Sequence, residues 1–230
     1  MKPSNPNNIV IKNKFVQITE YDLYNFWVKE KETILRNVSK NIFFYFSTEL
    51  NKSIIRRYEE KNKLINLNNF NYEKKINGHI VGVISTFETM SNFGIVDIDA
   101  PTLDICSEEI FNKIKNATYD VYSFLNKFYK CKIIYTGKNG FHIYVDFNYK
   151  YKLNTIKELL KNRLLENNDI IAKYTIENKR TPDRINLDLS LNKTSGGYIT
   201  LGSINKIGLQ SKLIKINELD NFDRLSTVII

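Results

Sequence analysis

The chain has 230 residues, with 34 Lys plus Arg against 25 Asp plus Glu and a net charge of +9 at pH 7. Its 42% hydrophobic content is that of a folded protein with one large domain or two small lobes. The positive charge favours a polyanionic partner, nucleic acid or a nucleoside triphosphate, over a membrane. Two cysteines, Cys106 and Cys131, exclude a disulfide framework and a cysteine-based zinc site within the chain. Without an apolar stretch of signal-peptide or membrane-spanning length, we expect a soluble, cytoplasmic protein.

The expected secondary structure interleaves helices and strands. In chain order, the spacing of apolar residues predicts a helix at 19–40, strands at 41–47, 79–86 and 94–100, a helix at 107–128, strands at 132–136 and 141–147, a helix at 154–165 and strands at 184–191, 197–203 and 211–216. The second helix would bury Ile110, Ile114, Val121, Leu125 and Phe128, and residues 61–77 read as loop. This pattern indicates an α+β fold with flanking helices and a mixed or mainly antiparallel sheet.

Two aspartates lie on the strand "GIVDIDA". Asp97 and Asp99 are two residues apart, so both side chains would point to one face of the strand, about 7 Å apart. Buried side by side, like charges repel, and a divalent cation removes the conflict. Oxygen ligands of this kind suit Mg²⁺ or Mn²⁺. A solvent-facing strand with two ordinary acids remains the alternative.

A third acid lies on the strand "RINLDLSLN", where Asp188 belongs to the polar face of an alternating pattern. Phosphoryl transfer with two metal ions usually recruits carboxylates from separate elements, which makes Asp188 the candidate third ligand. By itself, Asp188 would be an ordinary outward-facing acid on an amphipathic strand.

Two loops could hold phosphate groups. The hairpin "YTGKNGFHIYVDF" places His142 on the face opposite Phe141, directly after a turn with Lys138 and backbone donors. The later loop "LGSINKIGL" also combines small residues with Lys206. Each is also an ordinary turn sequence.

Together and in this order, these motifs resemble the catalytic subunit of the archaeo-eukaryotic primase superfamily, most closely the archaeal DNA primase small subunit. That family has a strand with D-x-D, a helix, a strand entering S-G-x-G-x-H, a distal Asp and a loop of the type P-G-S-L-H-G-K-T-G-L. The corresponding segments are "VDIDAPTLD", "YTGKNGFHIYV", "INLDLSLN" and "LGSINKIGLQSKLIKINELDNFD", within residues 81–224. The segment "DLSLN" also resembles the D-x-x-x-N of the repair polymerases associated with bacterial DNA ligases.

The resemblance implies a role for each matching residue. Asp97, Asp99 and Asp188 would be the catalytic carboxylates and the ligands of two Mg²⁺ or Mn²⁺ ions. The residues implied in nucleotide binding are Thr136, Gly137, Lys138, Asn139, His142, Ser203, Lys206 and, more loosely, Arg56 and Arg57. Thr136 replaces the family's Ser, Asn205 stands near its His, and the later loop is about one residue shorter, which weakens the match of Ser203 and Lys206. The family's Cys/His knuckle has no counterpart here, so we expect no zinc.

The resemblance also implies the fold and activity. It implies an RRM-like catalytic half packed on an N-terminal α/β unit, with residues 1–230 forming one primase catalytic domain or two closely packed lobes. The activity would be that of a DNA primase in DNA replication, a nucleotidyltransferase of the DNA-directed RNA polymerase type. It would synthesise short RNA or DNA primers on single-stranded DNA from NTPs or dNTPs. A large subunit with an iron–sulfur cluster, or an appended domain like it, would be the partner, since this chain has too few cysteines to hold the cluster.

Three alternatives remain at this point. A primase-polymerase or an end-joining repair polymerase of the same superfamily would use the same residues. A non-enzymatic, RRM-like nucleic-acid-binding module would stack bases on Tyr135, Phe141 and Tyr144. A metal-dependent nuclease would also be compatible with two acids and a histidine.

Overall fold

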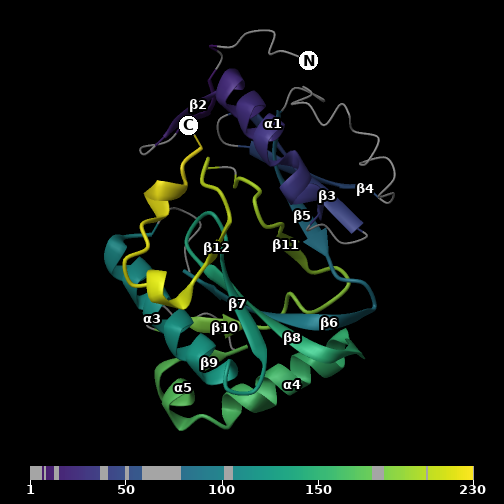
Figure 1. Ribbon diagram of the computed structural model, residues 1–230, viewed down its shortest axis with the longest axis vertical. Helices are drawn as coiled ribbons and strands as arrows, with labels where there is room; N and C mark the ends of the chain where they lie inside the picture. The colour runs from purple at the N-terminus through teal and green to yellow at the C-terminus, as the bar shows by residue number, and fades with distance from the viewer. Residues whose placement is uncertain are drawn as a thin grey trace. The chain divides into compact units, whose positions relative to one another are not determined.

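The computed structural model forms two compact units (Figure 1). It describes residue 7 and residues 9–12, 16–36, 41–49, 52–58, 79–100, 106–177, 184–205 and 207–229. The first unit comprises Met1–Thr86, Gly197–Lys212 and Asp223–Ile230, and the second comprises Phe87–Gly196 and Leu213–Phe222.

The first unit contains a helix and two small sheets. Strands β1 (Ile9–Lys12) and β2 (Gln17–Thr19) pair, and α1 (Glu20–Arg36) follows directly. A capping box forms at the start of this helix: the Thr19 amide donates to Asp22 Oδ2 at 2.8 Å, and the Asp22 amide donates to Thr19 Oγ1 at 3.3 Å. The second sheet has the order β11 (Gly197–Ile199), β5 (His79–Thr86), β3 (Asn41–Glu49) and β4 (Lys52–Tyr58). A 3₁₀ helix, η2 (Arg224–Thr227), lies in the C-terminal segment of this unit.

The second unit is built on a six-stranded sheet. In spatial order the strands are β12 (Lys212–Ile214), β7 (Lys130–Tyr135), β8 (Phe141–Lys152), β6 (Met90–Asp99), β10 (Asn186–Asp188) and β9 (Thr175–Ile176). The central pairs β7–β8, β8–β6 and β6–β10 are antiparallel, and β10 pairs with β9 in parallel. The sheet is therefore mixed and mainly antiparallel, as the sequence predicts.

Helices α3 (Glu108–Leu125) and α4 (Leu153–Leu165) cover one face of this sheet. Phe111 of α3 stacks on Phe141 with ring centroids 5.7 Å apart. On the same face, a Cβ atom added at Gly94 would lie only 2.5 Å from Ile156 Cγ2 of α4. Side chains alternate along each strand, so the neighbours of these core positions point to the opposite face. This alternation determines which residues can form a site there.

Most of the expected elements are confirmed, with corrections at their ends. The α3 helix begins after Ser107, whose hydroxyl accepts from the Ile110 amide at 3.3 Å, as the sequence predicts. Its buried face uses Phe111 rather than Ile110. Phe128 lies beyond the end of the helix and is half exposed beneath the guanidinium of Arg163.

The strand predicted at 184–191 is much shorter, because the chain turns after Asp188: the Ser190 amide donates to Asp188 Oδ1 at 2.6 Å. Strand β4 and the short helix α5 (Asn168–Lys173) were not predicted. The loop expected at 61–77 lies outside the described residues. Among the helices of the described part, none combines the length and apolar character needed to cross a membrane.

Candidate active site

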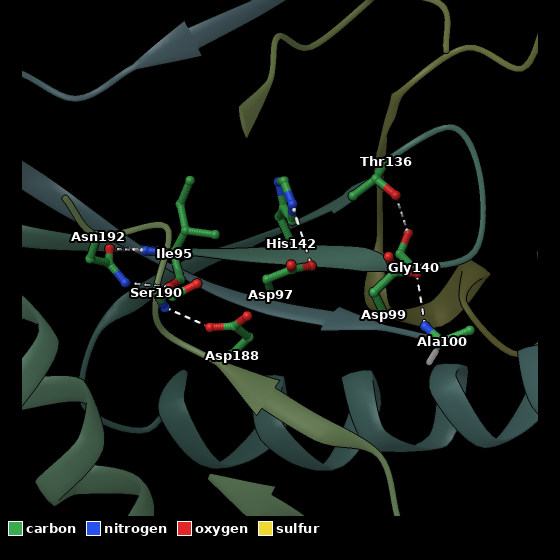
Figure 2. Close-up of polar contacts among 10 residues, drawn as sticks. All are labelled: Ile95, Asp97, Asp99, Ala100, Thr136, Gly140, His142, Asp188, Ser190 and Asn192. Atoms are coloured by element: carbon green, nitrogen blue, oxygen red, sulfur yellow. Dashed lines mark hydrogen bonds and ion pairs between the residues drawn. The ribbon is translucent and has the colours of Figure 1, made fainter. Parts of the chain in front are cut away.

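Three polar residues form a row across three neighbouring strands of the second unit. Asp188 on β10 is the Cα partner of Asp97 on β6, and Asp97 is in turn the partner of His142 on β8. Directly opposed residues of an antiparallel pair carry their Cβ atoms about 5 Å apart on the same face. Figure 2 shows Asp97 between the other two residues. The register therefore brings together two of the predicted carboxylates and the predicted histidine.

Asp99 extends the same face by one step along β6, opposite the end of the turn that precedes β8. A Cβ atom added at Gly140 would lie 2.4 Å from the carbonyl oxygen of Ile98 and 2.9 Å from Asp99 Oδ1. Contacts shorter than 3 Å with backbone are not tolerated, so this position requires glycine. Gly140 thus allows the turn to approach the aspartate-bearing strand closely.

The carboxylates of Asp99 and Asp188 accept hydrogen bonds from nearby backbone. Asp99 Oδ1 accepts from the Ala100 amide at 2.8 Å, and Asp188 Oδ1 accepts from the Ser190 amide at 2.6 Å (Figure 2). Within the described ranges, no three His, Cys, Asp or Glu side chains are oriented together as ligands of one ion. The donor set nevertheless fits a hard divalent cation, because three carboxylates share one face of the sheet. Binding would require these side chains to rotate toward one another.

His142 is a buried, neutral imidazole beside Asp97. It is 5% exposed, and its Nε2 lies 3.5 Å from Asp97 Oδ1. Burial lowers the pKa of His142 to about 4, so the contact with Asp97 at pH 7 is not an ion pair. In the part of the chain that the structure describes, His142 Nδ1 finds no hydrogen-bond partner. A buried polar atom without a partner costs about 1–3 kcal/mol, a cost that a bound ligand can remove.

The predicted phosphate-binding turn is held by its own hydrogen bonds. The Thr136 amide and hydroxyl both donate to the Gly140 carbonyl at 3.0 Å, and Gly137 takes a positive φ of 86°. The Tyr135 hydroxyl donates to the Lys138 carbonyl at 3.0 Å. Asn139 is fully buried, and its Oδ1 accepts from the Cys106 amide at 3.0 Å. The turn is thus held beside Asp99 by several hydrogen bonds, one of them accepted by the Asn139 side chain.

The remaining predicted site residues belong to the first unit. Ser203 is fully buried and exchanges backbone hydrogen bonds with Thr200 and Ser211. Arg56 and Arg57 lie on β4, opposite Phe44 and Phe43 of β3. Lys206 lies outside the described residues.

The base-stacking role considered for Tyr135 and Phe141 is wrong. Both rings are fully buried and pack against Phe111 and Phe222 in the core between the sheet and α3. Tyr144, which points to the opposite face, is half buried and stacks on Phe93 with ring centroids 5.4 Å apart. The alternation along β8 explains the difference. Tyr144 is two residues after His142 and points to the same face, whereas Phe141 is adjacent to His142 and points to the opposite face.

Asn192 is a site neighbour whose role the sequence did not reveal. Its side chain is 1% exposed and hydrogen-bonds to both backbone groups of Ile95, two residues before Asp97. The D-x-x-x-N spacing marked this asparagine in the sequence. The spacing alone gave no indication that its partner would be the backbone of β6.

The fold has a counterpart among solved structures. No protein-family model matches the chain, and no curated protein sequence does either. The polymerase domain of Mycobacterium tuberculosis Ligase D, in complex with DNA, superimposes with a TM-score of 0.58 at 10% sequence identity. The alignment covers 88% of this chain and 83% of that domain. The chain therefore has an α+β fold, with antiparallel sheets and flanking helices, similar to that of this polymerase domain.

Proposed function

We propose that the chain is a nucleotidyltransferase of the archaeo-eukaryotic primase superfamily, acting as a DNA primase catalytic subunit. The observation that carries this proposal is the register that opposes Asp188 to Asp97 and Asp97 to His142, with Asp99 one step further along β6. The similarity in fold to a polymerase domain, over most of both chains, supports the nucleotidyltransferase part of this proposal.

The opposed carboxylates explain why cations would be needed. Like charges directly opposite each other on paired strands destabilise the sheet, and divalent cations would offset this repulsion. Asp97, Asp99 and Asp188 would hold two Mg²⁺ or Mn²⁺ ions. When bound, such ions activate the attacking hydroxyl and neutralise charge on the phosphate groups.

His142 and the turn at 136–140 would bind the triphosphate. A neutral imidazole can donate one N–H to a phosphate oxygen, and the unpartnered Nδ1 indicates that the ring is not fully used by the protein itself. Lys138 would add charge, while Thr136, Gly137 and Asn139 fix the turn. Because the turn is already ordered, little entropy would be lost on binding.

Four further residues are assigned to phosphate contacts by the resemblance alone. Ser203, Lys206, Arg56 and Arg57 would contact phosphate groups of the nucleotide or of the nucleic acid. Single-stranded DNA template, a primer and NTPs or dNTPs would be the substrates, and the net charge of +9 suits these polyanions. A large subunit or an appended domain would assist initiation.

A repair polymerase is the second candidate. The structural counterpart is a ligase-associated polymerase domain, and "DLSLN" contains the matching D-x-x-x-N spacing. A repair polymerase extends an existing end, whereas a primase begins a chain from free nucleotides. The two candidates differ in the substrate that they require.

The test is an incorporation assay with Mn²⁺, single-stranded DNA and labelled nucleotides, without and with a supplied primer. Products from nucleotides alone support the primase, and products only from the primer support the repair polymerase. Both activities should disappear in Asp97→Ala and Asp188→Ala. Degradation of the template, abolished by the same substitutions, would instead identify a nuclease.

A further inference from the structure

Asn192 continues the β6–β10 ladder after β10 has ended. The last paired residues are Asp188 and Asp97, and the chain then turns away at Ser190. Asn192 Oδ1 accepts from the Ile95 amide at 2.8 Å, and Nδ2 donates to the Ile95 carbonyl at 2.7 Å (Figure 2). One side-chain amide thus satisfies both backbone groups that a further strand residue would have bonded.

The same amide also binds the turn that carries Asp188. Asn192 Nδ2 makes a second bond, to the Leu189 carbonyl at 3.0 Å, and the Asn192 amide donates to the same oxygen at 3.1 Å. The side chain therefore connects β6 to the residue directly after Asp188. Since it is 1% exposed, water cannot replace these bonds at low cost.

The space for this amide depends on Gly94. A Cβ atom at residue 94 would lie 3.2 Å from Asn192 Oδ1, in addition to its contacts with α4. Because residue 94 has no side chain, the side-chain amide of Asn192 can lie directly against β6. Gly94 and Asn192 together form a fitted contact between the turn and the strand.

We propose that Asn192 is a positioning residue that holds Asp188 opposite Asp97. Strand β10 has three residues and its outer neighbour β9 has two, so few ladder bonds determine where Asp188 lies. The three side-chain bonds of Asn192 add to that small number. Asn192 touches no substrate in this account and acts only through Asp188. The inference rests on the proposed function, because it assigns Asp188 to the metal site.

The experiment compares Asn192→Asp with a matched core variant, Thr118→Val. The aspartate keeps the shape and the acceptor of Asn192 but loses the two donated bonds and faces two carbonyl oxygens. Thr118 is also fully buried and donates its hydroxyl to the Ile114 carbonyl at 2.8 Å, within α3. Both variants should therefore lower Tm, but only the first should disturb Asp188.

Two readouts separate positioning from stability. Mn²⁺ binding is measured calorimetrically on the free protein, and kcat and KM for nucleotide incorporation are measured well below the Tm of each variant. For Asn192→Asp we expect Mn²⁺ affinity and kcat to fall about 10–100-fold with a smaller change in KM. For Thr118→Val we expect Mn²⁺ affinity and kcat to stay within about twofold of the wild-type values, since the lost hydrogen bond lies within α3.

Unchanged Mn²⁺ affinity and kcat in folded Asn192→Asp would overturn the inference. If that variant does not fold, Asn192→Ser takes its place, and failure of both to fold would show a purely structural role. Absence of incorporation by the wild-type chain would refute the proposed function. Weaker Mn²⁺ binding in Asn192→Asp alone would still support the positioning role.

Discussion

Asp188 and Asp97 are direct partners in the antiparallel pair of β10 and β6, although they are far apart in the sequence. His142 is the partner of Asp97 on its other side. Two acids and a buried neutral imidazole thus share one line across the sheet. In an ordinary structural sheet, this arrangement would cost stability without compensation.

The opposition of these carboxylates predicts that Asp97→Asn stabilises the metal-free protein. Removing one charge relieves repulsion worth up to about 1 kcal/mol, which raises Tm by about 2–4 °C for a chain of this size. Calorimetry in EDTA measures the change. A fall in Tm of similar size would show that the Asp97 carboxylate stabilises the fold.

The close approach of Gly140 to β6 predicts that Gly140→Ala loses both stability and activity. The added methyl group would meet the Ile98 carbonyl and the Asp99 carboxylate, so the turn must move away from β6. We expect a loss of about 1–3 kcal/mol in the free energy of unfolding, as for other overpacked sites. We also expect a large fall in kcat, because Asp99 and the turn would be displaced together. Denaturant unfolding and incorporation kinetics measure the two effects, and unchanged kinetics would contradict the placement of Asp99 in the site.

The hydrogen bond from the Tyr135 hydroxyl to the Lys138 carbonyl predicts that Tyr135 supports nucleotide binding rather than base stacking. Tyr135→Phe keeps the buried ring but removes the bond to the Lys138 carbonyl, a loss of about 0.5–1.5 kcal/mol. A less ordered turn should raise KM for the nucleotide severalfold with little change in kcat. The control is Tyr119→Phe, which alters a half-exposed tyrosine on α3. Equal kinetics in both variants would argue against a nucleotide-binding role for the turn.

The buried thiol of Cys131 is expected to make the folded protein less stable at alkaline pH. Burial, followed by the nearby charge of Asp146, raises the pKa of this thiol to about 12 from an ordinary value of 9.0. The unfolded chain therefore ionises first, and the folded state loses stability as the pH rises above about 9. Unfolding curves between pH 8 and about pH 10.5 should decline less steeply for Cys131→Ala than for the wild type. Parallel curves would show that the thiol is accessible to solvent in the folded protein.

Periodicity was sufficient to predict most elements, because apolar spacing reports the face that each element buries. The alternation of β8 correctly separates Phe141 from His142, and Ser107 correctly marks the start of α3. The end of β10 could not be predicted, because it depends on hydrogen bonds from Ser190 and Asn192 rather than on apolar alternation. In the sequence, "RINLDLSL" alternates as if the strand continued.

The candidate site was predictable as a set of residues but not as a geometry. Asp97, Asp99, Asp188 and His142 were recognisable from motif order, whereas their row depends on strand register, which a single sequence does not specify. The demand for glycine at residue 140 is likewise visible only once the turn lies against β6.

The most direct test of the central claim is nucleotide incorporation on a primed template by three Asp→Asn variants in Mn²⁺. Asp97→Asn and Asp188→Asn remove carboxylates of the opposed pair. Asp146→Asn is the matched control, since Asp146 lies on the same face of β8 and pairs with Lys132 at 3.2 Å. We predict that the first two variants fold and lose about 10²–10³-fold in rate, the loss expected when a main electrostatic contributor is removed. We predict that the control retains nearly full activity. Incorporation at the wild-type rate by Asp97→Asn or Asp188→Asn would contradict the account.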